Sequence, residues 1–148
     1  MSERFSIRWA YFVNVEVENG VVKSVSFSDE PIEEDIRTNF ARKLKRDVER
    51  YLSGQPVDFS AYPVAVHGFT ARVLEEVRKV GFGETTTYGE IARKLSTSPR
   101  AVGQALKRNP APIIIPCHRV VAKSGIGGYS SGEKIKRMLL ELEGVKLP

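Results

Sequence analysis

The first 27 residues alternate apolar and polar side chains, and an Asn-Gly pair interrupts the pattern. Apolar residues occupy every second position from Phe5 to Val17, and the alternation resumes between Val21 and Phe27. A period of two places the apolar side chains on one face of a strand. Asn19-Gly20 supplies two residues that tolerate the positive φ angles of a type I′ turn. We therefore expect a β-hairpin with one buried face.

A helical repeat follows this hairpin. Apolar residues recur every four positions from Ile32 to Leu52, and Gly54 is placed to end the helix. A strict four-residue repeat drifts around a helix of 3.6 residues per turn, so we expect a break near Thr38-Asn39. Residues 53–68 contain two prolines and two glycines without periodicity, which predicts a linker.

The second half of the chain has the spacing of short helices. Apolar residues between Phe69 and Val80 predict one helix. Thr87 and Glu90 have the spacing of a capping box, and Pro99 suits the first position of the helix after it. Two short helices joined by about three polar residues form the layout of a helix-turn-helix.

A last helix, from about Ile135 to Leu142, is predicted to end at Gly144. Taken together, the elements predict an α+β fold in two units. Residues 1–60 would form an N-terminal sheet-and-helix domain, and residues 61–148 a C-terminal, mainly helical domain.

Charge is unevenly distributed between the two halves. Residues 1–66 carry nine basic and eleven acidic side chains, whereas residues 67–148 carry fourteen basic and seven acidic ones. A surplus of positive charge attracts polyanions. The helix that begins near Pro99 adds Arg100, Lys107 and Arg108 beside small residues, which favours nucleic acid over a merely solvated surface.

Several classes of protein are disfavoured by the same sequence. A single cysteine, Cys117, cannot form an internal disulfide, so we expect a cytoplasmic protein. Cys117, His67 and His118 are the only sulfur or imidazole ligands, too few for a usual structural zinc site, so no metal is expected. No apolar run approaches the roughly 20 residues of a membrane span, and no cofactor motif is present.

Cys117 stands next to His118, one of only two histidines. Most lone cysteines are small buried hydrophobes. A thiolate is nonetheless the reactive form of cysteine, and a neighbouring base makes it available. Adjacent residues in an extended segment point to opposite sides, so a bridging water connects the pair more easily than direct contact.

The run Pro116-Cys117-His118-Arg119-Val120 is far more specific than this adjacency. It resembles the active-site motif of the O6-alkylguanine-DNA alkyltransferases, the methylated-DNA–protein-cysteine methyltransferases. The resemblance covers about residues 67–146 and includes several further segments in the family's order: Phe69-Thr70, Thr87-Tyr88-Gly89-Glu90-Ile91-Ala92, Arg100-Ala101-Val102-Gly103, Arg108-Asn109-Pro110, Gly128-Tyr129-Ser130 and Leu139-Leu140-Glu141-Leu142-Glu143-Gly144.

This resemblance implies direct-reversal DNA repair by a single-turnover methyltransferase without a cofactor. Cys117 would accept the alkyl group from O6-alkylguanine, and O4-alkylthymine is a second possible substrate. His118 would act through a water as the base, and Glu143 would orient and charge-stabilise His118. Asn109 would brace the turn before the acceptor. The implied fold is a ribonuclease-H-like N-terminal domain followed by a winged helix-turn-helix-type domain.

The resemblance also implies how the substrate is held. Tyr88 would donate a proton or hydrogen bond to guanine N3, with Lys136 in a supporting role. The main chain of Cys117, Val120 and Ser130 would read the base edge. The expected partner is double-stranded DNA with alkylated bases, bound by a monomer with its target base flipped out of the stack. The DNA contacts would come from Arg100, Ala101, Gly103 and Gln104.

Two alternatives remain open at this point. The chain could be a non-catalytic sensor of DNA lesions, or a cysteine hydrolase unrelated to DNA. A sensor would have no need of the thiol, and a hydrolase would have no need of the helix pair. Both therefore rank below direct repair.

Overall fold

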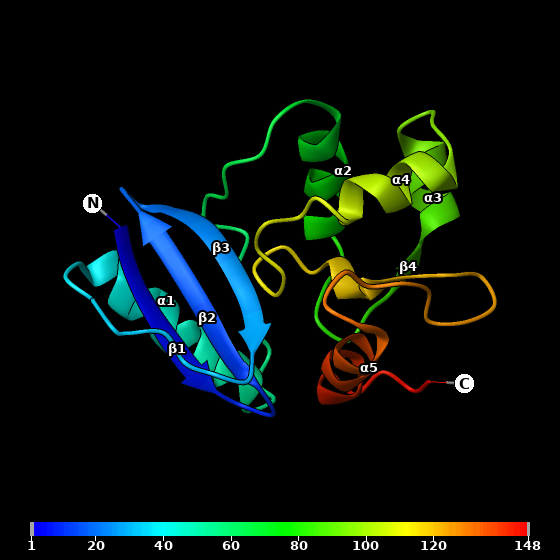
Figure 1. Cartoon of the computed structure of the whole chain (residues 1–148). Coiled ribbons are helices and arrows are strands. Elements are labelled where there is room, and N and C mark those ends of the chain that lie inside the picture. The colour runs from blue at the N-terminus through cyan, green and yellow to red at the C-terminus, as the bar shows by residue number, and fades with distance from the viewer. Residues whose placement is uncertain (1, 148) are drawn as a thin grey trace.

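The computed structural model describes residues 2–147. Over this range the chain has a mixed α/β fold with a three-stranded sheet, a two-stranded sheet and five α-helices. Figure 1 shows the larger sheet and helix α1 on one side of the molecule and the remaining helices on the other. None of the helices between residues 2 and 147 is long and apolar enough to cross a bilayer.

The larger sheet is an antiparallel meander of β1 (Ser2–Arg8), β2 (Phe12–Glu18) and β3 (Val21–Ser28). Asn19 and Gly20 have φ angles of 52° and 73°, so the predicted turn is confirmed. The sequence suggested one unbroken run from Phe5 to Val17, and this was wrong. The chain turns at Trp9–Tyr11, where the Trp9 N–H donates to the Tyr11 carbonyl at 2.8 Å. Alternation continues through this turn, so the pattern alone cannot reveal it.

Helix α1 (Asn39–Leu52) begins where the break was expected, with the Thr38 hydroxyl accepting from the Ala41 N–H. The helical repeat before Thr38 was a wrong prediction, because residues 32–37 form no helix. The Glu3 carboxylate accepts hydrogen bonds from the backbone N–H groups of Arg37 and Thr38. These bonds hold the segment against β1, and Asp35 forms a β-bridge with Arg4.

The caps predicted in the second half are present. The Thr87 hydroxyl accepts from the Glu90 N–H, and the Ser98 hydroxyl accepts from the Ala101 N–H with Pro99 in the first turn. These caps set the start of two helices that pack on each other. The elements in this half are α2 (Gly68–Arg78), β4 (Thr86–Thr87), α3 (Tyr88–Lys94), α4 (Pro99–Leu106), the 3₁₀ turn η1 (Cys117–Arg119), β5 (Val120–Val121) and α5 (Glu133–Leu142).

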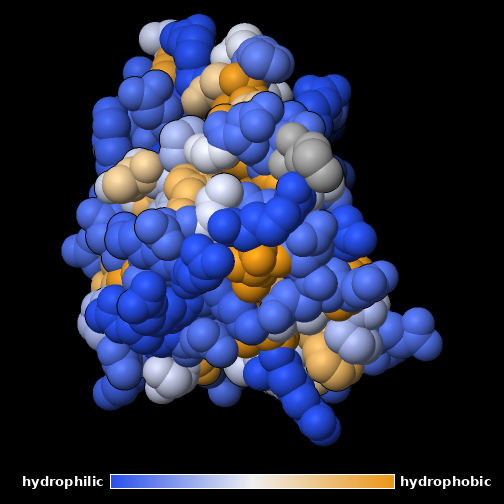
Figure 2. Space-filling view, turned by 90° about the vertical axis from the view of Figure 1, so that its left-hand side faces the viewer, coloured by the Kyte–Doolittle hydropathy of each residue, from blue (hydrophilic) through white to orange (hydrophobic). Residues whose placement is uncertain are grey.

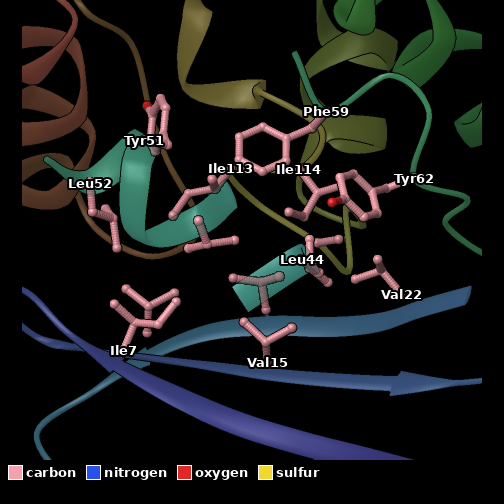
Figure 3. Close-up of a cluster of buried hydrophobic side chains, with 14 of the residues drawn as sticks. Ile7, Val15, Val22, Leu44, Tyr51, Leu52, Phe59, Tyr62, Ile113 and Ile114 are labelled. Atoms are coloured by element: carbon pink, nitrogen blue, oxygen red, sulfur yellow. The ribbon is translucent and has the colours of Figure 1, made fainter. Parts of the chain in front are cut away.

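Two clusters of buried hydrophobic side chains support these elements. The first lies between the three-stranded sheet, α1 and residues Ile113 and Ile114, as Figure 3 shows. Ile113 has a φ of 76°, a strained backbone for a β-branched residue that costs about 1–3 kcal/mol. Its burial in this cluster holds the strained turn in place, four residues before Cys117. The second cluster contains α2, α3 and α4 residues together with Cys117.

The outer surface beside the sheet is mainly polar. Figure 2 shows this face, where hydrophilic side chains surround small separate apolar patches. Among residues 2–147, Phe69 is the one large hydrophobic side chain that is exposed, at 36%.

Candidate active site

Cys117 opens the 3₁₀ turn η1 and is 4% exposed. Asn109 connects this turn to the end of α4, because its Nδ2 donates to the Ile115 carbonyl at 2.9 Å and to the Cys117 Sγ at 3.1 Å. The Asn109 Oδ1 accepts from the Ala111 N–H. A single amide side chain thus fixes both ends of the strained segment and contacts the thiol.

The Nε2 atom of His118 lies 2.6 Å from the Glu143 Oε2. The imidazole is fully buried. An ionised carboxylate only accepts hydrogen bonds, so Nε2 carries the proton and Nδ1 keeps a lone pair. Nδ1 is buried with no hydrogen-bond partner among the described residues. A buried acceptor of this kind can take a proton from a neighbouring group or from a water.

The Glu143 carboxylate lies at the centre of a buried polar cluster. Arg119 donates to it through Nε at 2.9 Å and Nη2 at 3.1 Å, and the Gly83 N–H donates at 2.9 Å. Tyr51 adds a hydroxyl donor at 2.5 Å. Burial by itself would raise the pKa of Glu143, but the bonds from His118, Arg119 and Tyr51 prevail and lower that pKa to about 2. Glu143 is therefore ionised at neutral pH.

Burial shifts the pKa values of Cys117 and His118 in opposite directions. It raises the pKa of the Cys117 thiol, and the hydrogen bond from Asn109, the neighbouring Tyr129 hydroxyl and the charge of Lys136 offset only part of this effect. Burial lowers the pKa of His118, and Glu143 offsets part of that shift. Both groups are thus neutral at pH 7, so the thiol has to lose its proton before its sulfur can act as a nucleophile.

An open pocket of about 650 Å³ gives access to Cys117. Its polar and apolar walls come from α3, α4 and the loop before α5. Six of the residues expected to contact substrate or DNA line it together: Tyr88, Arg100, Gly103, Gln104, Cys117 and Ser130.

Two residues expected near the base, Val120 and Lys136, do not line this pocket. Lys136 is fully buried, and its Nζ donates to the carbonyls of Val120 at 2.7 Å and Gly128 at 3.0 Å. The same Nζ lies 3.5 Å from the Tyr88 hydroxyl, and burial lowers the pKa of Lys136 to about 8. Lys136 thereby connects β5 and the loop before α5 to Tyr88.

Helix α4 presents a basic outer face beside the pocket. Arg100, Gln104 and Lys107 are exposed on it, whereas Ala105 packs inward. Ala101 is half-buried and does not line the pocket. Gly103, which has no side chain, lies on this face beside the Tyr88 ring, because a Cβ added there would be 3.9 Å from the Tyr88 Cε1.

Three side chains at this site were not assigned to it from the sequence. Arg119 donates to the Val80 carbonyl, but its main partner is Glu143. The buried Tyr129 hydroxyl faces the thiol and lines the pocket. Tyr51 comes from α1, 67 residues before His118. A tyrosine on the apolar face of a helix was the one available signal, because its hydroxyl needs a polar partner when buried.

Metal ligands do not gather at this site. Within residues 2–147, no three His, Cys, Asp or Glu side chains lie close enough to hold an ion. His67, at the start of α2, is exposed.

Known proteins are similar to this chain in sequence and in fold. A protein-family model described as "6-O-methylguanine DNA methyltransferase, DNA binding domain" matches residues 68–145. The methylated-DNA–protein-cysteine methyltransferase of Archaeoglobus fulgidus is 46% identical over 149 residues, which cover 95% of this chain and 99% of the relative. The protein of the same name from Sulfolobus acidocaldarius is 52% identical over 100 residues, 67% of this chain and 64% of the relative.

Solved structures agree over nearly the full length. The O6-methylguanine-DNA methyltransferase of Pyrococcus kodakaraensis superposes with a TM-score of 0.76 at 32% identity, covering 98% of this chain and 100% of the other. The Mycobacterium tuberculosis OGT in complex with DNA gives a TM-score of 0.77 at 29% identity, covering 97% and 92%. These matches in sequence and structure show that the chain belongs to the O6-methylguanine-DNA methyltransferase family.

Proposed function

We propose that this protein repairs alkylated DNA by moving one alkyl group from O6-alkylguanine to the Sγ of Cys117. The observation that carries the proposal is the pairing of a buried thiol at an open pocket with a neutral imidazole. The Nδ1 of that imidazole is an unpaired acceptor. The relatives named as methylated-DNA–protein-cysteine methyltransferases support it.

The proposed reaction is an in-line displacement. His118 Nδ1 takes the thiol proton through a water, and the Cys117 sulfur attacks the alkyl carbon. An S–C bond forms as the C–O6 bond breaks, and the bonding pair stays on guanine. Glu143 stabilises the resulting imidazolium. The product is a thioether, which does not hydrolyse under ordinary conditions, so each molecule reacts once.

We infer that the leaving guanine is stabilised by Tyr88. Burial raises the pKa of Tyr88, so its hydroxyl stays protonated and can donate toward guanine N3. The hydroxyl now bonds the Gly128 carbonyl at 3.2 Å, with Lys136 behind it. Ser130 lines the same pocket, so its main chain can meet the base edge.

We propose that α3 and α4 bind double-stranded DNA as a helix-turn-helix in a winged domain, with the target base flipped into the pocket. The exposed Arg100 would fill the vacated stack. The small residues Ala101 and Gly103 would let α4 approach a narrow minor groove, with Gln104 beside them. The ribonuclease-H-like N-terminal domain, the boundary between residues 60 and 61, the monomeric state and the cytoplasmic location stay predictions.

The direct test is intact mass after incubation with duplex DNA containing O6-methylguanine. The expected result is a gain of one methyl group per protein molecule and restoration of guanine in the duplex. Tight binding to the lesion without any gain would favour the sensor. Neither binding nor gain would reopen the hydrolase hypothesis.

Arg100→Ala should slow transfer from duplex DNA by about 10-fold or more, because an unfilled stack makes the extrahelical base less favourable by a few kcal/mol. Transfer from the free alkylated base should be unchanged. The rate constants are measured with both substrates. Arg42→Ala, an exposed arginine on α1, serves as control. An equal loss on both substrates would place Arg100 in the chemistry instead of in base flipping.

Gly127→Ala should slow transfer by about 10- to 100-fold, because it displaces Tyr88. A Cβ at Gly127 would lie 2.8 Å from the Tyr88 hydroxyl and 2.9 Å from its Cε2, and the φ of +76° favours glycine and strains other residues. Gly125→Ala is the matched control, since nothing lies within 4 Å of its Cβ. Rates are measured on methylated duplex. Equal rates for both variants would show that Tyr88 adapts without loss.

A further inference from the structure

A tyrosine from the N-terminal half completes the buried polar cluster around Glu143. Tyr51, near the end of α1, is fully buried. Its hydroxyl donates to the Glu143 Oε2 at 2.5 Å and lies 3.2 Å from the His118 Nε2. In Figure 3 this hydroxyl points away from the apolar side chains that surround the ring. Tyr51 therefore reaches the candidate base from outside the family-matched residues 68–145.

The ring of Tyr51 is held in a defined orientation. Phe59 and Phe82 meet it edge-on, with centroid distances of 5.9 and 6.1 Å. Phe59 belongs to the segment after α1, and Phe82 follows α2. An aromatic ring held by two such contacts loses little further freedom when its hydroxyl forms a hydrogen bond. The hydroxyl position is thus set by the packing of several elements.

Hydrogen bonds to Glu143 show what this hydroxyl does. Oε1 accepts from the Arg119 Nε and the Gly83 N–H. Oε2 accepts from the Arg119 Nη2, from Tyr51 and from the His118 Nε2. A carboxylate oxygen offers about two lone-pair directions, so three donors share Oε2. Tyr51 and His118 therefore compete for the same oxygen.

We propose that Tyr51 is a positioning residue for alkyl transfer: its hydroxyl fixes the Glu143 Oε2 and shares that oxygen with His118, which keeps the Nδ1 of His118 turned toward Cys117 and free of a proton. This inference rests on the function proposed above. It gives the N-terminal half a part in activating the thiol, beyond supporting the fold.

The charges around His118 set the direction of the expected effect. Glu143 favours the imidazolium, whereas Arg119 and Lys136 oppose it, and the neighbouring Cys117 is neutral. Tyr51 itself stays protonated, because burial raises its pKa well above the usual range. Loss of its hydroxyl concentrates the charge of Glu143 on His118. The pKa of His118 should then rise, and the base should become protonated at a higher pH.

The test is Tyr51→Phe, which keeps the packed ring and removes only the hydroxyl. The transfer rate at saturating methylated duplex should fall about 3- to 10-fold at its plateau, the effect of one lost hydrogen bond. The acid limb of its pH profile should move upward by about half a pH unit or more. Rates are measured by intact mass between pH 5 and 8.

Tyr62→Phe is the matched control. Tyr62 is also buried, and its hydroxyl also donates to a carboxylate. The acceptor is the Asp47 Oδ2 on α1, the helix that carries Tyr51, at 2.5 Å. Both variants should lose a similar few degrees of melting temperature. Only Tyr51→Phe should change the rate and the pH profile. Equal profiles for the two variants would overturn the proposal and leave Tyr51 a packing residue.

A second readout does not depend on transfer. The chain has two histidines, so imidazole proton resonances in the NMR spectrum report on His118 with the exposed His67 as internal reference. The midpoint of His118 should rise in Tyr51→Phe alone. An unchanged midpoint contradicts the inference. Failure of the wild-type protein to transfer an alkyl group would instead refute the proposed function.

Discussion

Replacement of Cys117 by alanine will abolish alkyl transfer, because it removes the only thiol in the chain. No other side chain at the pocket combines a soft nucleophile with a neighbouring base. The alanine variant should still bind methylated duplex, since the outer face of α4 does not depend on Sγ. Intact mass after incubation should therefore show no added methyl group, and the lesion should remain in the DNA.

The wild-type protein, treated in parallel, should gain one methyl group per molecule. Peptide mapping should place the modification at Cys117. A methyl group on the alanine variant would show a second acceptor, and the roles proposed for His118 and Glu143 would then fail. Loss of lesion binding along with transfer would show that the thiol itself contributes to recognition.

Glu143→Gln should have the next largest effect, on both rate and stability. Without the carboxylate, His118 loses the group that stabilises its imidazolium, and losses of about 10²- to 10⁴-fold are typical for disabled acid–base catalysis. The variant also leaves Arg119, 6% exposed, as a buried charge without its partner. Breaking such a pair costs about 3–5 kcal/mol. Single-turnover rates and thermal unfolding measure the two effects.

The pH dependence of stability checks the same assignment. The pKa of Glu143 is about 2 in the folded protein against 4.5 for a glutamate carboxyl group in water. Its contribution to stability is therefore present above about pH 4.5 and is lost as the pH falls toward 2. The glutamine variant should lack this part of the acid dependence. Glu141→Gln, an exposed change in the last turn of α5, should alter neither rate nor stability.

A milder outcome would identify which part of the argument is wrong. If Glu143→Gln unfolds like the wild type, the Arg119 charge has found another partner. If it transfers at the wild-type rate, His118 does not need the carboxylate. In the second case Tyr51 could not act through Glu143, and the inference drawn from their shared oxygen would fall as well.

The acceptor segment depends on both hydrophobic clusters. Ile113 and Ile114 pack with the sheet and α1, whereas Ile115 and Cys117 pack with α2, α3 and α4. The segment between α4 and η1 thus joins the two halves of the molecule, with Asn109 fixing its geometry. A strained residue at Ile113 persists because neighbours on the sheet side hold it.

Local sequence patterns determined a large part of this structure. The Asn19-Gly20 turn, the Thr38 break, the Thr87 cap and the helix start at Pro99 were all predicted from short-range sequence patterns. The conformations at these positions depend on neighbours in the chain, which is why the sequence reveals them. The turn at Trp9–Tyr11 was not predicted, because the alternation of apolar and polar side chains runs through it unchanged.

The acceptor motif was also visible in the sequence, whereas its surroundings were decided only by the tertiary structure. The 3₁₀ turn that aims His118 at Glu143, the bidentate Arg119 and the hydroxyl of Tyr51 depend on contacts between residues 24 to 92 positions apart. Buried polar groups must all find partners, but sequence spacing does not say which partners the packed elements bring within reach. The sequence by itself therefore determined the family and the candidate nucleophile, and the packing of α1, η1 and α5 decided how the candidate base is held.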